Sequence, residues 1–213
     1  ALRLIPENTA TRAKALNNLG VVYDVTGDQT AALTHISKAL EIQRRLLAGS
    51  AQRDTIVYEA AVYLTNMGNL HLKRSNFDKA VALFEEALLL LKAILPKDHH
   101  TVLDCLQCIV VSKAMNGDTE SALEILHECH QTQSNRYGSL SEASMETVGL
   151  SGFVYARHGD FENALKSVFT VRRWQKANLT DEHPALHRTK ECIKALESRM
   201  GTSIVSSVAK IWV

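Results

Sequence analysis

Apolar residues recur every three to four positions along most of the chain, which predicts amphipathic helices separated by short polar turns. The first two helices are expected over about 9–25 and 29–47, with Gly27-Asp28 as the turn between them. Later stretches follow the same plan, a long apolar-periodic segment, a polar pair and a second such segment. The further turns are expected at Ser75-Asn76, Gly117-Asp118 and Gly159-Asp160.

Small residues recur at matching places in these predicted helix pairs. Gly68 and Ala80 are expected to let two antiparallel helices approach closely, while Leu64, Phe84 and Ala87 interlock between them. One such hairpin cannot bury its apolar face alone, so it needs similar hairpins on either side. Equivalent alanines follow one another after 48, 42 and 42 residues: Ala32, Ala80, Ala122 and Ala164.

The pattern therefore predicts an all-α fold, a right-handed α-solenoid of four helix hairpins and a terminal capping helix. The solenoid is expected over 1–200, with repeats of about 9–49, 54–95, 99–135 and 141–178 and a capping helix over 185–200. Residues 1–8 resemble Ala93–Asp98, with Pro6 and Pro96 in the same register. Leu2–Ile5 are accordingly the tail of a preceding repeat or a short frayed terminus, and the start at Ala1 suggests a fragment or a processed form.

The stretch Glu59–Ala93 resembles the helix-turn-helix pattern of the tetratricopeptide repeat, W-x2-L-G-x2-Y followed by A-x3-F. Here the pattern reads L-x2-M-G-x2-H, from Leu64 to His71, and then A-x3-F-x2-A, from Ala80 to Ala87. Three features are similar to the longer repeats of kinesin light chains and related proteins: the 42-residue spacing, the runs before helices at 97–100 and 181–184, and the run N-N-L-G at 17–20. The resemblance covers about residues 5–200. Nothing in the chain resembles the heptad region through which a light chain joins a heavy chain.

Composition narrows the function classes. Hydrophobic residues make up 46 % of the chain and only 3 Pro occur, which favours an all-α core. Lys and Arg total 24 against 23 Asp and Glu, so no electrostatic field favours nucleic acid or an anionic membrane. No apolar run is long enough to span a bilayer, and no signal peptide is visible. Four cysteines without a dense disulfide framework indicate a reducing compartment, and we expect the cytoplasm.

The resemblance implies a concave groove, lined by the first helices of the hairpins, that takes an extended peptide. Asn18 and Asn66 share one register position, and an asparagine amide offers both the donor and the acceptor that an extended main chain needs. Two interpretations stay open for this pair, a clamp on a peptide backbone and a hydrogen bond between neighbouring helices. The groove is polar over the first two repeats and more apolar over the last two. Its expected residues are Lys14, Asn17, Asn18, Val21, Asp24, Val62, Thr65, Asn66, Asn69, Lys73, Asp104, Gln107, Cys108, Val111, Met115, Glu146, Leu150, Phe153 and Arg157.

Other candidate sites are weaker. Cys105 and Cys108, with the His127–His130 run, have spacings like those of zinc ligands, but we expect small buried side chains at these positions and no metal or cofactor. His99-His100 is expected to cap or pack at the start of a helix. Arg44-Arg45 is expected on a solvated face. No nucleophile and base, phosphate-binding loop or paired carboxylates have a recognisable spacing, so no enzyme activity is predicted.

The tail 201–213 has an apolar face at helical spacing, formed by Ile204, Val208, Ile211 and Trp212. Three uses stay open: capping the last helix, occupying the groove of the same chain, and acting as a short C-terminal motif for a PDZ domain. The predicted function is a non-catalytic scaffold that binds a protein or an extended peptide, with no nucleic acid and no membrane insertion. The alternative is an architectural spacer or self-associating solenoid with an empty groove.

Overall fold

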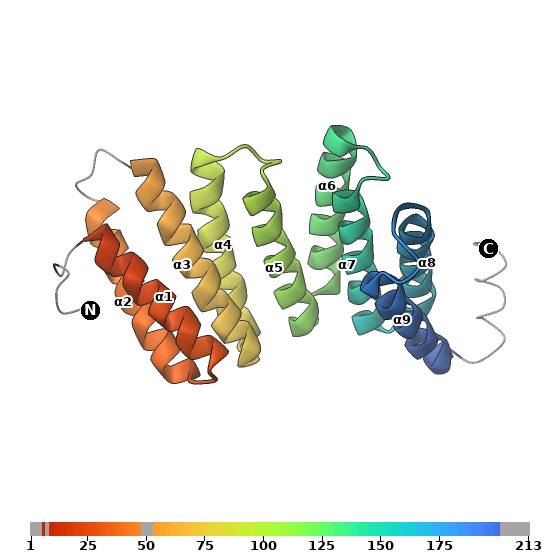
Figure 1. The fold of residues 1–213 in the computed structure, drawn as a ribbon, viewed down its shortest axis with the longest axis horizontal. Helices are drawn as coiled ribbons and strands as arrows, with labels where there is room; N and C mark the ends of the chain where they lie inside the picture. Colours follow the sequence, from red (N-terminus) through yellow and green to blue (C-terminus); the bar gives the residue numbers. More distant parts are fainter. Residues whose placement is uncertain (1–5, 7–8, 48–52, 201–213) are drawn as a thin grey trace. The chain divides into compact units, whose positions relative to one another are not determined.

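The computed structural model describes residues 6, 9–47 and 53–200, and the described residues form helices and the short turns between them (Figure 1). The chain divides into two compact units, Ala1–Ser112 and Lys113–Val213. Each unit is described by itself below. The predicted tail and Leu2–Ile5 lie outside the described residues.

The first unit contains two complete helix hairpins followed by most of a fifth helix. Each of its first three helices packs on the next one along the chain, and the first and third also touch. The observed bounds of the first and second helices confirm the predicted ones to within one residue. The helices are α1 (Ala10–Val25), α2 (Gln29–Leu47), α3 (Arg53–Lys73), α4 (Phe77–Ile94) and α5 (His100–Asn116).

The second unit repeats the same sequential packing. Its described helices are α6 (Thr119–Tyr137), α7 (Glu142–His158), α8 (Phe161–Asn178) and α9 (Pro184–Met200). Helix α6 packs on α7, α7 on α8, and α8 on α9. The last helix buries Ile193 and Leu196 in one cluster with Ala164 and Leu165 of α8. Its exposed side carries Lys190, Glu191 and Lys194.

The hairpin turns lie where the sequence predicts them. Gly117 and Gly159 have φ angles of 90° and 87°, in the left-handed region that glycine adopts at little cost. In both turns the following aspartate caps the second helix, because its side chain accepts the backbone N–H three residues further on. Ser75 holds the turn between α3 and α4 with a φ of 58°, which is unusual for a residue other than glycine.

Small residues bring the two helices of a hairpin into close contact. A Cβ atom placed on Gly68 would lie 2.6 Å from Cε1 of Phe84, closer than real Cβ atoms come to a neighbour. Phe84, Leu64, Ala80 and Ala87 are all fully buried. The interlocking predicted for this hairpin is therefore confirmed.

Neighbouring hairpins are joined by buried polar contacts as well as by apolar packing. Thr147 of α7 donates a hydrogen bond to Oε1 of Gln133 at 2.6 Å, and Thr189 of α9 makes the same bond to Gln175 at 2.7 Å. The two pairs lie 42 residues apart, one repeat length, so they are the same contact made twice. Buried polar groups of this kind favour one register of stacking, because a shifted helix would leave them without partners.

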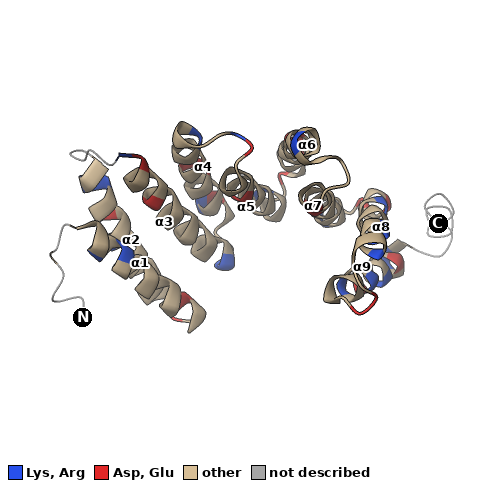
Figure 2. Ribbon diagram, turned by 45° about the horizontal axis from the view of Figure 1, so that its top comes forward, with Lys and Arg blue, Asp and Glu red and all other residues tan. Residues whose placement is uncertain are grey.

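Basic and acidic residues are scattered over the helices of both units (Figure 2). This distribution agrees with the near-zero net charge, +1 at pH 7. Among the described helices, none combines the length and the apolar character needed to cross a bilayer.

Candidate functional site

Five of the predicted groove residues of the first two repeats line a pocket formed by α1, α2 and α3: Val21, Asp24, Asn66, Asn69 and Lys73. The pocket has a volume of about 210 Å³. Its polar lining consists of Asp24, Asn66, Asn69 and Lys73, all of which were expected from the sequence. The apolar part of its lining consists of Val21, Ile36, Leu70 and Leu72. We call the residues Asn17, Val21, Asp24, Asn66, Asn69 and Lys73 the α1–α3 face.

Two polar contacts bridge the two helices across this face. The Asn66 side-chain amide donates to Oδ1 of Asn17 at 2.9 Å, and the Lys73 ammonium lies 2.6 Å from Oδ2 of Asp24. Both pairs join residues 49 positions apart, and they lie two helical turns from each other. The face is therefore held at two points, with the pocket open between them.

Asp24 supplies an acceptor that the described residues do not use. Its Oδ2 atom pairs with Lys73, whereas its Oδ1 atom is buried and has no hydrogen-bond partner among the described residues. A buried oxygen without a donor is unfavourable by about 1–3 kcal/mol. A donor from a bound molecule would satisfy this oxygen. Because Lys73 already balances the carboxylate charge, an uncharged N–H suits the position better than a second cation.

The two asparagines of the proposed clamp differ in their surroundings. Asn18 is exposed, as a residue free to contact a ligand must be. Asn66 is half-buried and donates to Asn17, which is itself only 5 % exposed. For Asn66, the structure thus favours the second interpretation left open by the sequence, a hydrogen bond to a neighbouring helix. Lys14, a further predicted residue of α1, is exposed.

Further predicted groove residues lie on α5 and α7. Gln107, Val111 and Met115 are half-buried on α5, with Met115 beyond the boundary between the two units. On α7 of the second unit, Leu150 is half-buried while Phe153 and Arg157 are exposed. Their spacing of three and four residues places the three α7 side chains on one side of that helix. The structure groups the predicted residues within each unit, and whether they form one groove stays a prediction.

Cys105 and Cys108, whose spacing resembles that of zinc ligands, are buried and half-buried on α5. Cys105 is buried and its thiol donates to the carbonyl oxygen of Phe84 at 3.3 Å. Burial, followed by the neighbouring Cys108 and Asp104, raises the pKa of Cys105 to about 12. Burial and Asp104 also raise the pKa of Cys108. Both thiols are thus protonated at neutral pH, which makes them poor nucleophiles.

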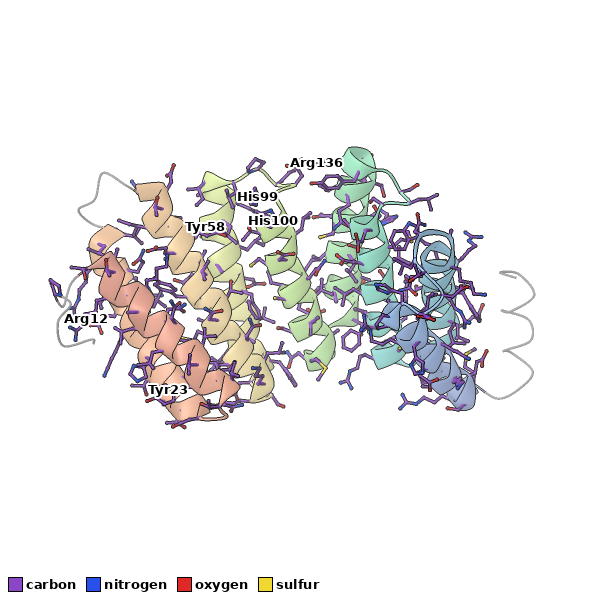
Figure 3. All side chains as sticks on the ribbon, viewed as in Figure 1. Arg12, Tyr23, Tyr58, His99, His100 and Arg136 are labelled. Atoms are coloured by element: carbon purple, nitrogen blue, oxygen red, sulfur yellow. The ribbon has the colours of Figure 1, made fainter. Side chains whose placement is uncertain are left out.

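The histidine before α5 acts at the start of that helix, as predicted. Nδ1 of His99 accepts the backbone N–H of Thr101 at 3.3 Å, and its ring lies 4.3 Å from that of His100 (Figure 3). His183 makes the equivalent contact with Ala185 before α9, at 3.2 Å. Among the described residues, no group of three or more His, Cys, Asp or Glu side chains is placed to hold a metal ion.

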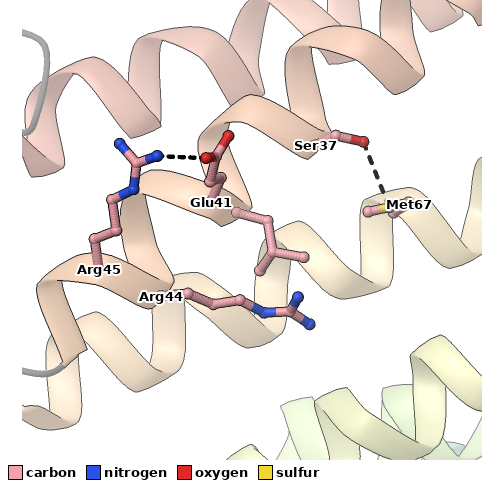
Figure 4. Close-up of a pocket in the computed structure, with 6 residues that line it drawn as sticks. Ser37, Glu41, Arg44, Arg45 and Met67 are labelled. Atoms are coloured by element: carbon pink, nitrogen blue, oxygen red, sulfur yellow. Dashed lines mark hydrogen bonds and ion pairs between the residues drawn. The ribbon is translucent and has the colours of Figure 1, made fainter.

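Sequence reasoning missed a second hollow, of about 440 Å³, between α2 and α3 (Figure 4). Leu40 and Met67 form its apolar lining, and Arg45 pairs with Glu41 at its edge. Arg44 pairs with Glu86 of α4 at 2.7 Å. Both arginines are more than half exposed, so the predicted solvated face is confirmed. No sequence signal marks the hollow, because Met67 reaches it from another hairpin.

The sequence profile of the tetratricopeptide repeat family matches residues 12–49 and 60–101. These stretches contain α2, α4 and most of α1 and α3. All residues of the α1–α3 face lie within the matched parts of α1 and α3. No curated protein sequence matches the chain.

Solved structures share the fold over nearly the whole chain. One is a kinesin light chain candidate of Podosopora anserina with nearly identical tetratricopeptide-like repeats, with a TM-score of 0.71, 17 % identity, and coverage of 95 % of this chain and 96 % of that one. A single-residue variant of the same Podosopora anserina protein gives a TM-score of 0.71 at 17 % identity, covering 95 % of each chain. BtubC (BKLC) from P. vanneervenii gives a TM-score of 0.72 at 15 % identity, covering 95 % of this chain and 78 % of that one. Residues 12–49 and 60–101 are thus tetratricopeptide repeats, and the chain shares the all-α solenoid fold of these kinesin light chain-like structures.

Proposed function

We propose that the protein is a non-catalytic interaction module that binds an extended peptide segment of a partner protein on the α1–α3 face. The observation that carries the proposal is the pocket around Asp24. It combines an unused buried acceptor, amide groups and an apolar lining, and it lies between two helices that are already fixed by cross-helix hydrogen bonds. A site held in place before binding costs less to order when the ligand arrives.

The chemistry of the pocket fits a main chain with one small apolar side chain. The free Oδ1 of Asp24 can accept a peptide N–H, and the Asn69 amide can donate to a peptide carbonyl. Val21, Leu70 and Leu72 offer an apolar surface for the side chain between those two backbone contacts. A volume of about 210 Å³ limits that side chain to a small or medium aliphatic group.

The competing function is architectural, with the solenoid acting as a spacer or self-association surface and the pocket staying empty. The unused oxygen of Asp24 supports the binding function because it belongs to a residue that lines the pocket, whereas other unpartnered buried atoms, such as Oε1 of Gln43, do not. We further propose a reducing, cytoplasmic setting, which the four free cysteines support.

The test is a selection of displayed random peptides on the full chain, followed by titration of the enriched peptides. Asn69→Arg places a long side chain into the pocket and is expected to weaken binding by at least about tenfold, or ~1.4 kcal/mol. Thr34→Arg adds the same side chain at an exposed position of α2, away from the pocket, and serves as the matched control. Binding that is equally strong in both variants, or no enriched peptide at all, would count against the proposal.

A further inference from the structure

The hollow between α2 and α3 has no part in the proposed peptide site. We call it the α2–α3 hollow, and its lining consists of Ser37, Leu40, Glu41, Arg44, Arg45 and Met67. None of these residues lines the pocket on the α1–α3 face. Its volume of about 440 Å³ lies within the range of about 300–1,000 Å³ that is usual for small-molecule sites. An inference about its ligand is therefore independent of the peptide-binding proposal.

The charged and apolar groups of the α2–α3 hollow are separated along α2. Arg45 and Glu41 lie at one end, and Ser37 and Met67 meet at the other, where the Ser37 hydroxyl is 4.0 Å from the Met67 sulfur (Figure 4). Leu40, only 5 % exposed, belongs to the lining between them. The eight positions from Ser37 to Arg45 extend over about 12 Å of helix. A ligand that fits this hollow has a charged head group and a short apolar tail.

The charges around the α2–α3 hollow sum to zero. Arg45 pairs with Glu41 of the same helix, and Arg44 pairs with Glu86 of α4 at 2.7 Å. The four side chains are 43 to 60 % exposed, so the two ion pairs contribute little to stability and their charges can also bind ligand groups. A phosphate would face Glu41 and Glu86, and a simple amine would face both arginines. A zwitterion is attracted by both signs of charge.

The apolar floor of the hollow is small. It consists of Leu40 and the half-buried Met67. Two side chains offer far less area than the roughly 800 Å² that each partner contributes to a standard protein interface. They suffice for one aliphatic chain, and the flexible thioether of Met67 can adapt to its shape. The floor therefore fits a small molecule better than a protein partner.

We propose that the α2–α3 hollow binds a free α-amino acid with a large aliphatic side chain, such as leucine. The ligand carboxylate binds Arg44 and Arg45, its ammonium group binds Glu41, and its side chain lies on Leu40 and Met67. A free amino acid carries its two charges on one carbon atom, which suits a cation and an anion four residues apart on one side of a helix. A peptide holds its terminal charges farther apart, by about 3.3 Å or more for each added residue.

The test is nuclear magnetic resonance of the full chain with ¹³C-labelled methionine methyl groups. The chain has four methionines, and Met67 lines the hollow, so Met67→Leu assigns its signal. Titration with L-leucine to millimolar concentration should shift the Met67 signal in a saturable way and leave the other three in place. Glycine lacks the tail, N-acetyl-L-leucine lacks the ammonium group and L-leucinamide lacks the carboxylate. Each should bind at least about tenfold more weakly than leucine.

Two matched variants locate the carboxylate contact. Arg44→Gln removes one of its partners and should weaken leucine binding by at least about tenfold. Arg188→Gln makes the same change at an exposed position of α9 and should leave binding unchanged. Circular dichroism checks that both variants fold, and the ligand series on the unmodified chain does not depend on either of them.

Three results would overturn the proposal. The first is a Met67 signal that leucine does not move. The second is equal affinity for leucine and for any one of glycine, N-acetyl-L-leucine and L-leucinamide, because tail or charge recognition would then be missing. The third is an equal loss of binding in Arg44→Gln and Arg188→Gln, which would place the ligand outside the α2–α3 hollow.

Discussion

Asn66 of α3 and Asn17 of α1 are joined by a side-chain hydrogen bond of 2.9 Å, and Asn17 is only 5 % exposed. The contact fixes the spacing of the two helices that carry the α1–α3 face. Asn66 also lines the pocket, so this bond stabilises the pocket wall before any ligand is bound.

Replacing Asn17 by Ala is expected to destabilise the first unit by about 1–2 kcal/mol, because the Asn66 amide loses its buried acceptor. Asn66→Ala should cost at least as much, since it leaves the Asn17 oxygen, on a side chain only 5 % exposed, without its donor. Urea unfolding of both single variants and the double variant measures the coupling between them. If the two single effects simply add, the hydrogen bond contributes nothing and the two helices are held by other contacts.

The close approach of Gly68 to Phe84 predicts a second stability effect. Gly68→Ala places a methyl group 2.6 Å from a fully buried aromatic ring, and the resulting overpacking should cost about 1–3 kcal/mol. Gly149→Ala is the matched control, because its nearest neighbour would be Val171 at 3.7 Å, an ordinary contact. The control should be neutral or stabilising by up to ~1 kcal/mol, since alanine favours helix more than glycine does. Equal thermal midpoints for the two variants would refute the packing argument.

The helices and turns could be predicted because they depend on neighbouring residues in the sequence. Gly117 and Gly159 mark two of the turns, and the spacing of apolar residues marks the helices. The 42-residue spacing then predicts the same elements in the next repeat. The partner of Asn66 could not be predicted in the same way. Residues in contact across α1 and α3 are 49 positions apart, whereas equivalent residues are 48 apart, so Asn66 meets Asn17 and not its register equivalent Asn18.

The pocket could not be predicted from the sequence either. Its lining comes from α1, α2 and α3, and the unused oxygen of Asp24 depends on where the Lys73 side chain ends. The 56 % exposure of Val22 on α1 has the same origin, since the residue type suits a buried position and only the absence of a covering helix among the described residues leaves it open. The sequence pattern predicts on which side of a helix a residue lies. Whether that residue is buried, exposed or part of a pocket depends on the packing of several helices.

The repeated Gln–Thr contact predicts a rescue. Thr147→Val keeps the shape of the side chain but removes the hydroxyl, leaving the buried Gln133 amide oxygen without its donor at a cost of about 1–3 kcal/mol. Adding Gln133→Leu should recover most of the loss, because both polar partners are then gone. Chemical unfolding of the single and double variants measures this. A double variant less stable than the single one would show that the pair contributes through packing rather than hydrogen bonding.

Burial of Cys105 predicts a loss of stability in alkali. Its pKa is raised from the ordinary value of 9.0 to about 12, so the folded state favours the neutral thiol. The stability gained in this way is fully present below pH 9.0 and is lost as the pH rises toward 12. Cys105→Ala should therefore show a shallower decline in unfolding free energy above pH 9.0 than the wild type. Parallel declines for the two proteins would assign the alkaline loss to other groups, such as Tyr63, whose pKa is also raised by burial and by Glu59.

The measurement that tests the central claim most directly is amide hydrogen exchange of the full chain with and without a peptide enriched by selection. Peptide binding on the α1–α3 face should slow exchange in α1 around Asn17 to Asp24 and in α3 around Asn66 to Lys73, and Asn69→Arg should abolish the change. Protection confined to α2 and α4, or to the second unit, would contradict the account and place the partner on another surface.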